Sequence, residues 1–397
     1  MAVITIKDLY KIFGPQPQAV WPLIEQGLSK KEIHARTGHT VGINNVSFSV
    51  DQGEIFVVMG LSGSGKSTLI RCLNRLIEPS SGEILIEGEN ILTAGNEKLL
   101  EIRRKKIAMV FQKFALFPHR NIRSNVEYGL EIQGVPVQER REKAYQAIEL
   151  VGLKGYEESM PDELSGGMQQ RVGLARALAT DPDILLMDEA FSALDPLIRK
   201  EMQNELLELQ AKMHKTIIFI THDLDEALKI GDRIAMMRDG RIIQIGTSED
   251  ILTQPADDYV RDFVQGVDRT KVLTAASIMK KPEPLVLPKD GPRVAVRRMK
   301  EENISSIYAV NSNRQFMGMI RIEAALELVR SGKHDLREVI VEDVPLTSPE
   351  TPILDLLPVA FNAKSPIVVL DSNQVMVGII GRASVISNIV GEGNQHD

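Results

Sequence analysis

The sequence predicts an α/β protein with a mainly parallel sheet flanked by helices, followed by a smaller module that contains a repeated unit. Short apolar runs alternate with helical stretches over the first part of the chain, as in doubly wound folds. A glycine-rich turn joins one of these runs directly to a helix. Beyond about residue 266, two similar pairs of apolar runs recur about 60 residues apart, which indicates an internal duplication.

The strands of the predicted sheet correspond to apolar runs. Residues 3–8 and 43–50 look like two strands of one sheet, and a turn at 51–53 closes the second. The run at 54–59 leads straight into the glycine-rich turn. Further strands are expected at 107–110, 184–187, 216–220 and 234–237. Their alternation with helical stretches predicts that most of them lie parallel.

Two helical segments interrupt this alternation. Residues from about 115 to 180 have a helical pattern and predict a helical subdomain. Residues 15–40 form an insertion between two strands, with Ser29 as the expected N-cap and Glu32 three residues later. This insertion could be a helix–turn–helix that reads DNA or a small helical excrescence on the domain face. The acidic chain favours the second, because one short helix pair supplies few phosphate contacts.

Composition limits the classes of protein. The 397 residues suffice for two or three domains, and the net charge of −7 argues against a nucleic-acid partner. The one cysteine, Cys72, excludes an intrachain disulfide and is expected at a packed helix position. The N-terminus lacks a signal-peptide pattern, and no apolar run reaches the roughly 20 residues that cross a bilayer. We therefore expect a cytoplasmic chain that works at membranes only through a partner.

Residues 60–67 read Gly-Leu-Ser-Gly-Ser-Gly-Lys-Ser, a phosphate-binding loop between a strand and a helix. Its backbone amides can surround a β-phosphate, and the following helix adds a favourable dipole. Lys66 is expected between the β- and γ-phosphates, and Ser67 on Mg²⁺. The nucleotide-contacting residues predicted from this loop are Gly60, Leu61, Ser62, Gly63, Ser64, Gly65, Lys66, Ser67 and Thr68.

Polar side chains follow three of the predicted strands, at the edge where doubly wound folds bind ligands. Asp188 would hold Mg²⁺ directly or through water, and Glu189 would polarise the attacking water. The amide of Gln112 is expected near the metal and the water, and His222 near the γ-phosphate. The predicted catalytic residues are Lys66, Gln112, Glu189 and His222, and the predicted metal-binding residues are Ser67, Gln112 and Asp188.

Residues 164–168 read Leu-Ser-Gly-Gly-Met, with two glycines where a helix is expected to begin. Exposed amides and a positive helix end could grip an anion there through Ser165, Gly166 and Gly167. Since the chain already binds phosphates with its own loop, this second anion-binding site would bind the nucleotide of another copy of the domain. A glycine hinge that simply opens a helix is the alternative.

The order of these motifs resembles the ATP-binding cassette (ABC) family over residues 3–265. The matching motifs are the phosphate loop, Gln112, residues 164–168, the acidic strand 184–189, Ser192-Ala-Leu-Asp195 and His222. The resemblance implies a P-loop core with an antiparallel β segment and a helical subdomain. It also implies a head-to-tail dimer that sandwiches two ATP molecules, with Phe13 stacked on adenine and Asp195 coupling the two sites. Met168 stands where the family usually has glutamine.

Within that family, the chain resembles ATPase subunits of glycine betaine/proline betaine importers over its whole length. The segments that carry this likeness are 15–40, 59–67, 74–79 and 187–199. The resemblance implies an integral-membrane permease, a periplasmic or extracellular substrate-binding protein, and a peripheral location on the cytoplasmic face of the plasma (inner) membrane. The cargo could also be choline, carnitine or another amine. An ABC ATPase acting on DNA or ribosomes is disfavoured, because the chain has one cassette and no sustained heptads.

Residues 112–125 would then line the groove that receives a permease helix. Phe114, Leu116 and Phe117 are expected to supply exposed apolar anchors, with ordinary core packing as the alternative.

The repeated unit resembles a tandem pair of CBS (cystathionine β-synthase) domains of βαββα type. The predicted domains are therefore a cassette at 1–266, a first CBS domain at 267–335 and a second at 336–397. Each has a strand pair joined by an Asn/Asp-rich turn. These pairs are 306–310 with 317–320, and 367–370 with 375–380.

The ligand of this module is harder to predict. Where nucleotide-binding CBS domains carry Ser/Thr and Asp, this chain has Arg321 and Ala324, and then Gly381 and Ser384. These residues put an AMP-type ligand in doubt. Sensing of ionic strength through Arg297, Arg298 and Lys300 is one hypothesis, and stabilisation of a dimer is the other.

Overall fold

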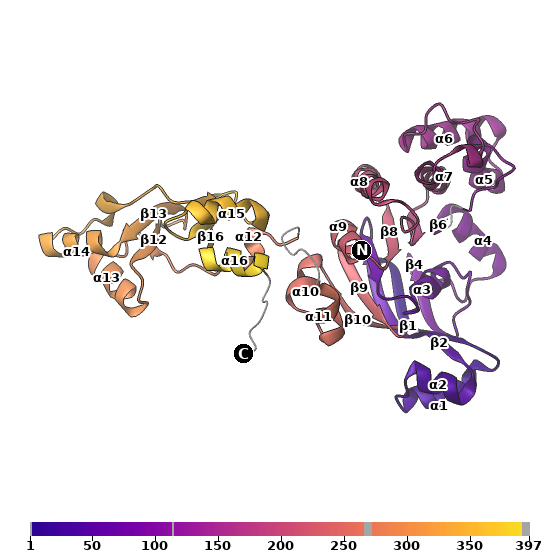
Figure 1. The fold of residues 1–397 in the computed structure, drawn as a ribbon, viewed down its shortest axis with the longest axis horizontal. Coiled ribbons are helices and arrows are strands. Elements are labelled where there is room, and N and C mark those ends of the chain that lie inside the picture. Colours follow the sequence, from indigo (N-terminus) through magenta and orange to yellow (C-terminus); the bar gives the residue numbers. More distant parts are fainter. Residues whose placement is uncertain (1, 113–114, 266–271, 391–397) are drawn as a thin grey trace. The chain divides into compact units, whose positions relative to one another are not determined.

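The computed structural model describes residues 2–112, 115–265 and 272–390. The chain divides into two compact units, Met1–Gly266 and Val267–Asp397. Figure 1 traces the elements of each unit along the sequence.

A six-stranded sheet is the centre of the first unit. Its order is β10-β9-β3-β8-β7-β6, and every neighbouring pair is parallel except β9 with β10. The strands are β3 (Ile55–Met59), β6 (Ile107–Val110), β7 (Ile184–Asp188), β8 (Thr216–Thr221), β9 (Arg233–Arg238) and β10 (Arg241–Gly246). All residues of β3, β7 and β8 are buried, which explains their continuous apolar runs. The predicted mainly parallel sheet is confirmed.

An antiparallel sheet of order β2-β1-β4-β5 forms a second layer. Its strands are β1 (Ala2–Phe13), β2 (Thr40–Asp51), β4 (Ser81–Ile86) and β5 (Glu89–Asn90). The runs predicted at 3–8 and 43–50 are thus the centres of two 12-residue strands. Phe13 pairs with Thr40, so the insertion leaves and re-enters the sheet at one point of the β1–β2 ladder.

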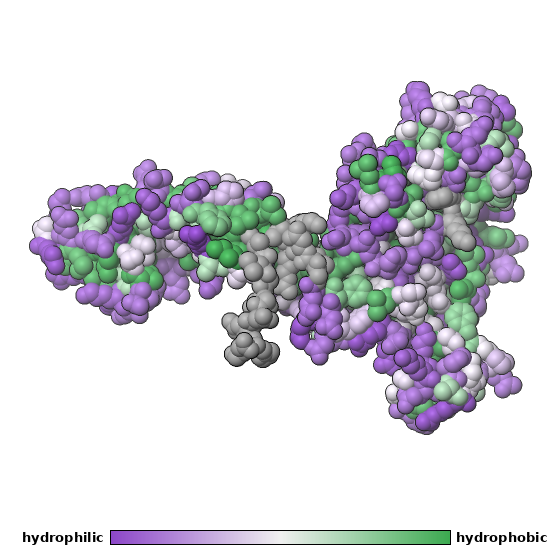
Figure 2. Space-filling model, viewed as in Figure 1, coloured by the Kyte–Doolittle hydropathy of each residue, from purple (hydrophilic) through white to green (hydrophobic). Residues whose placement is uncertain are grey.

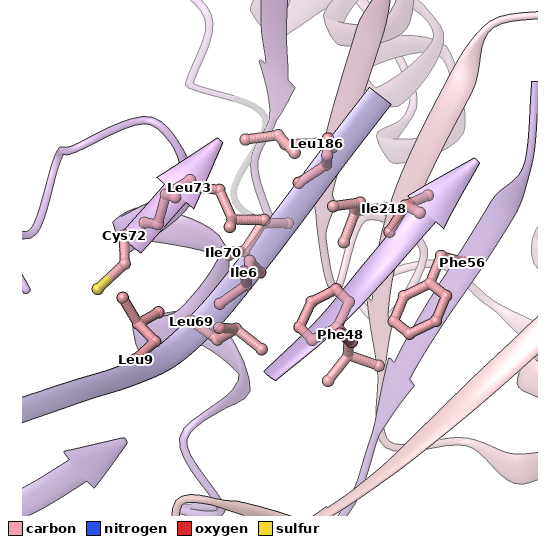
Figure 3. Close-up of a cluster of buried hydrophobic side chains, with 14 of the residues drawn as sticks. Ile6, Leu9, Phe48, Phe56, Leu69, Ile70, Cys72, Leu73, Leu186 and Ile218 are labelled. Carbon is pink, nitrogen blue, oxygen red and sulfur yellow. The ribbon is translucent and has the colours of Figure 1, made fainter. Parts of the chain in front are cut away.

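The hydrophobic core of the first unit lies between these sheets and α3 (Lys66–Leu73). Figure 3 shows Phe48 of β2 facing Phe56 of β3, and their rings stack at 4.7 Å. Cys72 of α3 is fully buried, which confirms its predicted role as a packed helix residue. Burial raises the pKa of its thiol to about 12, so the thiol is unreactive at neutral pH.

Helices complete the first unit. They are α4 (Asn96–Lys105), α5 (Ile122–Ile132), α6 (Val137–Leu150), α7 (Gly166–Leu178), α8 (Pro196–Met213), α9 (Leu224–Ile230), α10 (Ser248–Thr253) and α11 (Asp258–Val264). The predicted helical subdomain consists of α5, α6 and α7, which pack on one another. Buried Glu127 of α5 joins α5 to α6, because it pairs with Arg123 at 2.8 Å and with Arg140 at 3.2 Å.

The insertion folds as η1 (Pro17–Val20), α1 (Trp21–Glu25) and α2 (Lys30–Thr37), at the end of the β1–β2 hairpin (Figure 1). Ser29 caps α2, and Glu32 completes the capping box, as predicted. Within the described residues, no helix combines the length and the apolar character that crossing a bilayer requires.

The second unit contains two three-stranded sheets with the same plan. One has β11 (Leu285–Val286), β12 (Ser306–Val310) and β13 (Phe316–Arg321), and the other has β14 (Leu346–Thr347), β15 (Ile367–Leu370) and β16 (Met376–Ile380). In each, the first pair is parallel and the second antiparallel. The helices are α12 (Ala275–Ile278), α13 (Pro292–Glu301), α14 (Ile322–Ser331), η4 (Leu336–Val339), α15 (Ile353–Asn362) and α16 (Arg382–Val390). Both predicted strand pairs are present.

Surface side chains of this unit differ in character from helix to helix. Figure 2 shows apolar residues over α15, where Leu354 and Phe361 are 49% and 58% exposed. The predicted basic cluster on α13 is partly neutralised, because Arg297 lies 3.9 Å from Glu301 and Arg298 lies 3.7 Å from Glu302. The uncompensated positive charge on α13 is therefore smaller than the sequence suggests.

Candidate active site

The phosphate-binding loop joins β3 to α3 in a conformation that only glycine adopts easily. Gly60 and Gly65 have φ values of +151° and +109°. A Cβ on Gly60 would collide with the carbonyl oxygen of Met237 in β9, and one on Gly65 with that of Gly42 in β2. The loop is thus held against both sheets by contacts that leave no room for a side chain at these two positions.

Lys66 lies inside this loop. Its Nζ donates to the carbonyl oxygens of Gly60 at 2.8 Å and Leu61 at 3.2 Å, and it lies 3.9 Å from Oε1 of Glu189. Burial lowers the pKa of Lys66, and the carboxylates of Glu189 and Asp188 oppose that shift. A buried cation held mainly by carbonyl oxygens would gain from a phosphate oxygen close by.

Asp188, at the end of β7, is buried and meets α3. Its Oδ1 accepts a hydrogen bond from Ser67 Oγ at 2.8 Å, and its Oδ2 accepts one from Arg71 Nη2 at 3.1 Å. Arg71 is not among the site residues predicted from the sequence. Its spacing could have indicated a role in the site, because Arg71 stands four residues after Ser67 and therefore lies on the same face of the helix.

Glu189 is the point where the predicted catalytic side chains meet. Gln112 Nε2 donates to its Oε2 at 3.0 Å, and Nδ1 of His222 lies 3.5 Å from the same oxygen. With Lys66 at Oε1, side chains from the phosphate loop and from the ends of β6 and β8 converge on this carboxylate. Its backbone has a φ of +48°, a left-handed conformation that is costly for a non-glycine residue and common at functional sites.

Residues 164–168 lie in the helical subdomain. Ser165 caps α7 by accepting a hydrogen bond from the amide of Met168 at 3.3 Å, so the predicted helix start is confirmed. A Cβ on Gly167 would lie 2.6 Å from a methyl group of Ile198, which explains the second glycine. Within the described part of the chain, no hydrogen bond joins Ser165, Gly166 or Gly167 to the phosphate loop.

The loop 192–195 lies between β7 and α8. Asp195 caps α8 through the amides of Leu197 and Ile198. Arg199, one turn into α8, donates to the carbonyl oxygen of Leu194 at 3.1 Å and to Oδ2 of Asp223 at 3.3 Å. Asp223 follows His222 directly, so Arg199 links the loop to the residue next to this histidine. Arg199 is not among the site residues predicted from the sequence.

Phe13 stands at the end of β1 with 39% of its surface exposed. Its ring covers Gly42, where a Cβ would lie 2.7 Å from a ring carbon and 3.4 Å from the methyl group of Thr68. Lys11 Nζ lies 4.9 Å from the ring centroid. An exposed aromatic ring beside the start of α3 is suited to stacking on a purine.

Leu116 and Phe117 are half-buried, and Phe114 lies outside the described residues. The Phe117 ring packs on Tyr128 of α5 at 4.6 Å, with the Arg120 guanidinium 5.5 Å from its centroid. For Phe117 the structure supports core packing, the alternative to an exposed anchor.

The residues present fit a nucleotide with a magnesium ion. Ser64 Oγ is buried in the loop and has no hydrogen-bond partner among the described residues, as expected of a group that awaits a ligand. Ser67 and Asp188 offer the oxygen donors that Mg²⁺ prefers. In the described chain, no group of three or more His, Cys, Asp or Glu forms a metal site. A metal here would therefore complete its coordination with phosphate oxygens and water.

Comparison with known proteins agrees with this geometry. The ABC transporter family model matches residues 43–192, and the CBS domain model matches residues 275–331. Glycine betaine/carnitine transport ATP-binding protein GbuA of Listeria monocytogenes is 52% identical, over 98% of both chains. This chain belongs to the glycine betaine group of ABC transporter ATP-binding proteins. As a member of this family it binds ATP, and it couples ATP hydrolysis to transport.

Other members of the family are similarly close. Glycine betaine transport ATP-binding protein OpuAA of Bacillus subtilis is 54% identical, over 98% of this chain and 92% of its own. Glycine betaine/proline betaine transport system ATP-binding protein ProV of Escherichia coli is 49% identical, over 98% of both chains.

Solved cassettes share the fold of the first unit. The dimeric structure of the bacterial ABC transporter cassette MJ0796 has a TM-score of 0.53 and 30% identity, and covers 62% of this chain and 98% of its own. A post-hydrolysis state of MJ0796, bound to ADP and Pi, is equally similar. The predicted fold class of an ABC core followed by CBS structure is therefore correct.

Proposed function

We propose that this chain hydrolyses ATP to energise the import of glycine betaine, proline betaine or a related quaternary amine osmoprotectant. The observation that carries the proposal is the convergence of Lys66, Gln112 and His222 on Glu189 beside the phosphate loop. The cargo class rests on the relatives named for glycine betaine transport, which match this chain over nearly its whole length.

Each side chain has a role that its position supports. Lys66 binds the β- and γ-phosphates, and Ser67, Gln112 and Asp188 bind Mg²⁺ directly or through water. Glu189 accepts a proton from the attacking water, because it is the carboxylate that the other catalytic groups surround. His222 contacts the γ-phosphate. Phe13 stacks on the adenine.

The site is completed by a second copy of the chain, arranged head to tail. Residues 165–167 have no polar contact with their own phosphate loop among the described residues, so they are available to grip the partner's nucleotide. Leu61 in the loop and Leu197 after Asp195 are 58% and 68% exposed. Two such apolar side chains beside the catalytic residues suit a surface that closes against a partner.

Three further parts of the proposal extend beyond the catalytic site. The permease is an integral-membrane subunit, and a periplasmic or extracellular binding protein delivers the amine to it. The chain itself works on the cytoplasmic face of the plasma membrane. Residues 267–335 and 336–397 act as a tandem CBS module that regulates transport, supported by the common plan of their two sheets.

Uptake of labelled glycine betaine tests the proposal. Cells that lack their own importers would receive this chain with its neighbouring permease and binding protein, and uptake would be measured across a series of medium osmolalities. Glu189→Gln serves as the inactive control. We expect uptake that rises with osmolality and is abolished in the control.

The possible outcomes test the ATPase activity and the assignment of the cargo separately. Betaine uptake in the Glu189→Gln strain would contradict the role of this carboxylate. Absence of betaine uptake, with ATPase activity intact in the purified chain, would leave the ATPase standing and overturn the cargo assignment.

A further inference from the structure

The insertion between β1 and β2 touches the phosphate loop. Lys30, the first residue of α2, donates a hydrogen bond from Nζ to the carbonyl oxygen of Gly63 at 3.1 Å. Gly63 lies in the middle of the loop whose amides face the nucleotide phosphates. A lysine ammonium has three donors, and this carbonyl occupies one of them.

The helix that carries Lys30 is held firmly in place. A small core of Ile12, Val20, Ile33 and Val41, each no more than 1% exposed, joins the insertion to β1 and β2. The capping box of Ser29 fixes the start of α2 one residue before Lys30. The position of the Lys30 backbone is therefore set by packing and not by the bond to Gly63.

The ends of the insertion are anchored beside Phe13. The His39 side chain is buried against Gly14, where a Cβ would lie 2.5 Å from the imidazole ring. The Nδ1 atom of His39 lies 3.1 Å from the carbonyl oxygen of Thr37, and its Nε2 faces that of Pro15. Because Phe13 precedes Gly14, the same anchor fixes the ring that we assign to adenine.

We infer that the insertion is part of the nucleotide site, and that Lys30 is a positioning residue for the phosphate loop. It holds Gly63 by a charge-assisted hydrogen bond and adds a positive charge beside the triphosphate. One structural element thus supports the adenine through Phe13 and the phosphates through Gly63. The inference rests on the proposed ATP site and adds to it a residue that the phosphate-loop motif does not contain.

Three variants of the full chain test this role. Lys30→Gln removes the charge, and Lys30→Arg keeps it. Lys31→Gln is the matched control, because Lys31 is the next residue of α2 and is exposed. For each, the Kd of a fluorescent ATP analogue and of competing ADP and AMP would be measured, with ATPase kinetics and the unfolding midpoint.

We expect Lys30→Gln to raise the Kd and the KM for ATP about threefold to tenfold, as loss of one solvent-exposed hydrogen bond would. The kcat and the unfolding midpoint should stay unchanged, because Lys30 touches neither Glu189 nor the core. The loss should be larger for ATP than for AMP, which lacks the β- and γ-phosphates. It should shrink as salt screens the charge. Lys30→Arg should restore most of the affinity.

Two results would overturn the inference. One is a Kd for Lys30→Gln within twofold of the wild-type value, and the other is an equal loss in Lys31→Gln. Failure of the wild-type chain to bind ATP at all would instead overturn the proposed function, and this inference with it.

Discussion

Glu226 of α9 is a carboxylate that the protein buries at a cost. It is 5% exposed, and its Oε1 accepts a hydrogen bond from Gln203 Nε2 at 3.1 Å. Burial raises its pKa above the usual value, although hydrogen bonds from Thr221 and Gln203 oppose the shift. The folded state therefore binds a proton more readily than the unfolded state, and stability contributed at this residue falls as the pH rises through the raised pKa.

Glu226→Gln is expected to stabilise the protein near pH 8, because glutamine keeps the size of the side chain and removes the buried charge. The gain should disappear as the pH falls through the raised pKa towards the unfolded value, because a protonated Glu226 is then as neutral as glutamine. Urea unfolding between about pH 4 and pH 8 would measure this, because the ordinary pKa of the Glu226 carboxyl is 4.5. Glu201→Gln, at an exposed position of α8, is the control. A variant less stable than wild type at pH 8 would contradict the expected cost of burial.

At the scale of elements, the sequence was a good guide to strands and a poor one to contacts between loops. Short buried apolar runs such as 184–188 predict strands. The polar residues that follow the parallel strands lie at the same edge of the sheet. The sequence alone therefore predicts that Asp188, Gln112 and His222 lie close together.

Residues that act through tertiary contacts could not be predicted in this way. Arg199 and Lys30 stand in helices where an exposed basic residue is ordinary, and neither belongs to a motif that binds phosphate. Their significance depends on which carbonyl lies within reach, Leu194 for one and Gly63 for the other. Such pairings depend on packing between elements distant in sequence, which periodicity does not encode.

Arg199→Met tests whether the loop 192–195 and the end of β8 act as one element. Methionine keeps the apolar stem and removes the bonds to Leu194 and Asp223. We expect kcat to fall by about tenfold, the effect of a small misplacement of His222, with the Kd for ATP unchanged. Steady-state ATPase assays and a binding titration would separate the two quantities.

Lys200→Met is the matched control for this variant, because Lys200 is the neighbouring exposed residue of α8. An equal fall in kcat in the control would contradict the role of Arg199. A higher Kd for ATP in Arg199→Met, with kcat unchanged, would also contradict this role.

At the scale of the whole molecule, one chain supplies all the side chains that surround Glu189. Among the described residues, its residues 165–167 make no hydrogen bond to its own phosphate loop. The two units have separate hydrophobic cores, and every residue assigned to ATP lies in the first. In the head-to-tail dimer that we propose, the first unit of a second chain would complete the site by placing its Ser165 at the first chain's nucleotide.

Association that depends on ATP follows from this arrangement. Glu189→Gln keeps the size and one oxygen of the side chain but cannot accept the proton, so bound ATP should persist and hold two chains together. The variant, at 44.1 kDa per chain, should double its mass in light scattering when MgATP replaces MgADP. Adding Ser165→Arg should abolish the increase, because a bulky side chain at the start of α7 blocks the grip on the partner's phosphate. A mass that ignores the nucleotide, or an increase that survives Ser165→Arg, would contradict the head-to-tail dimer.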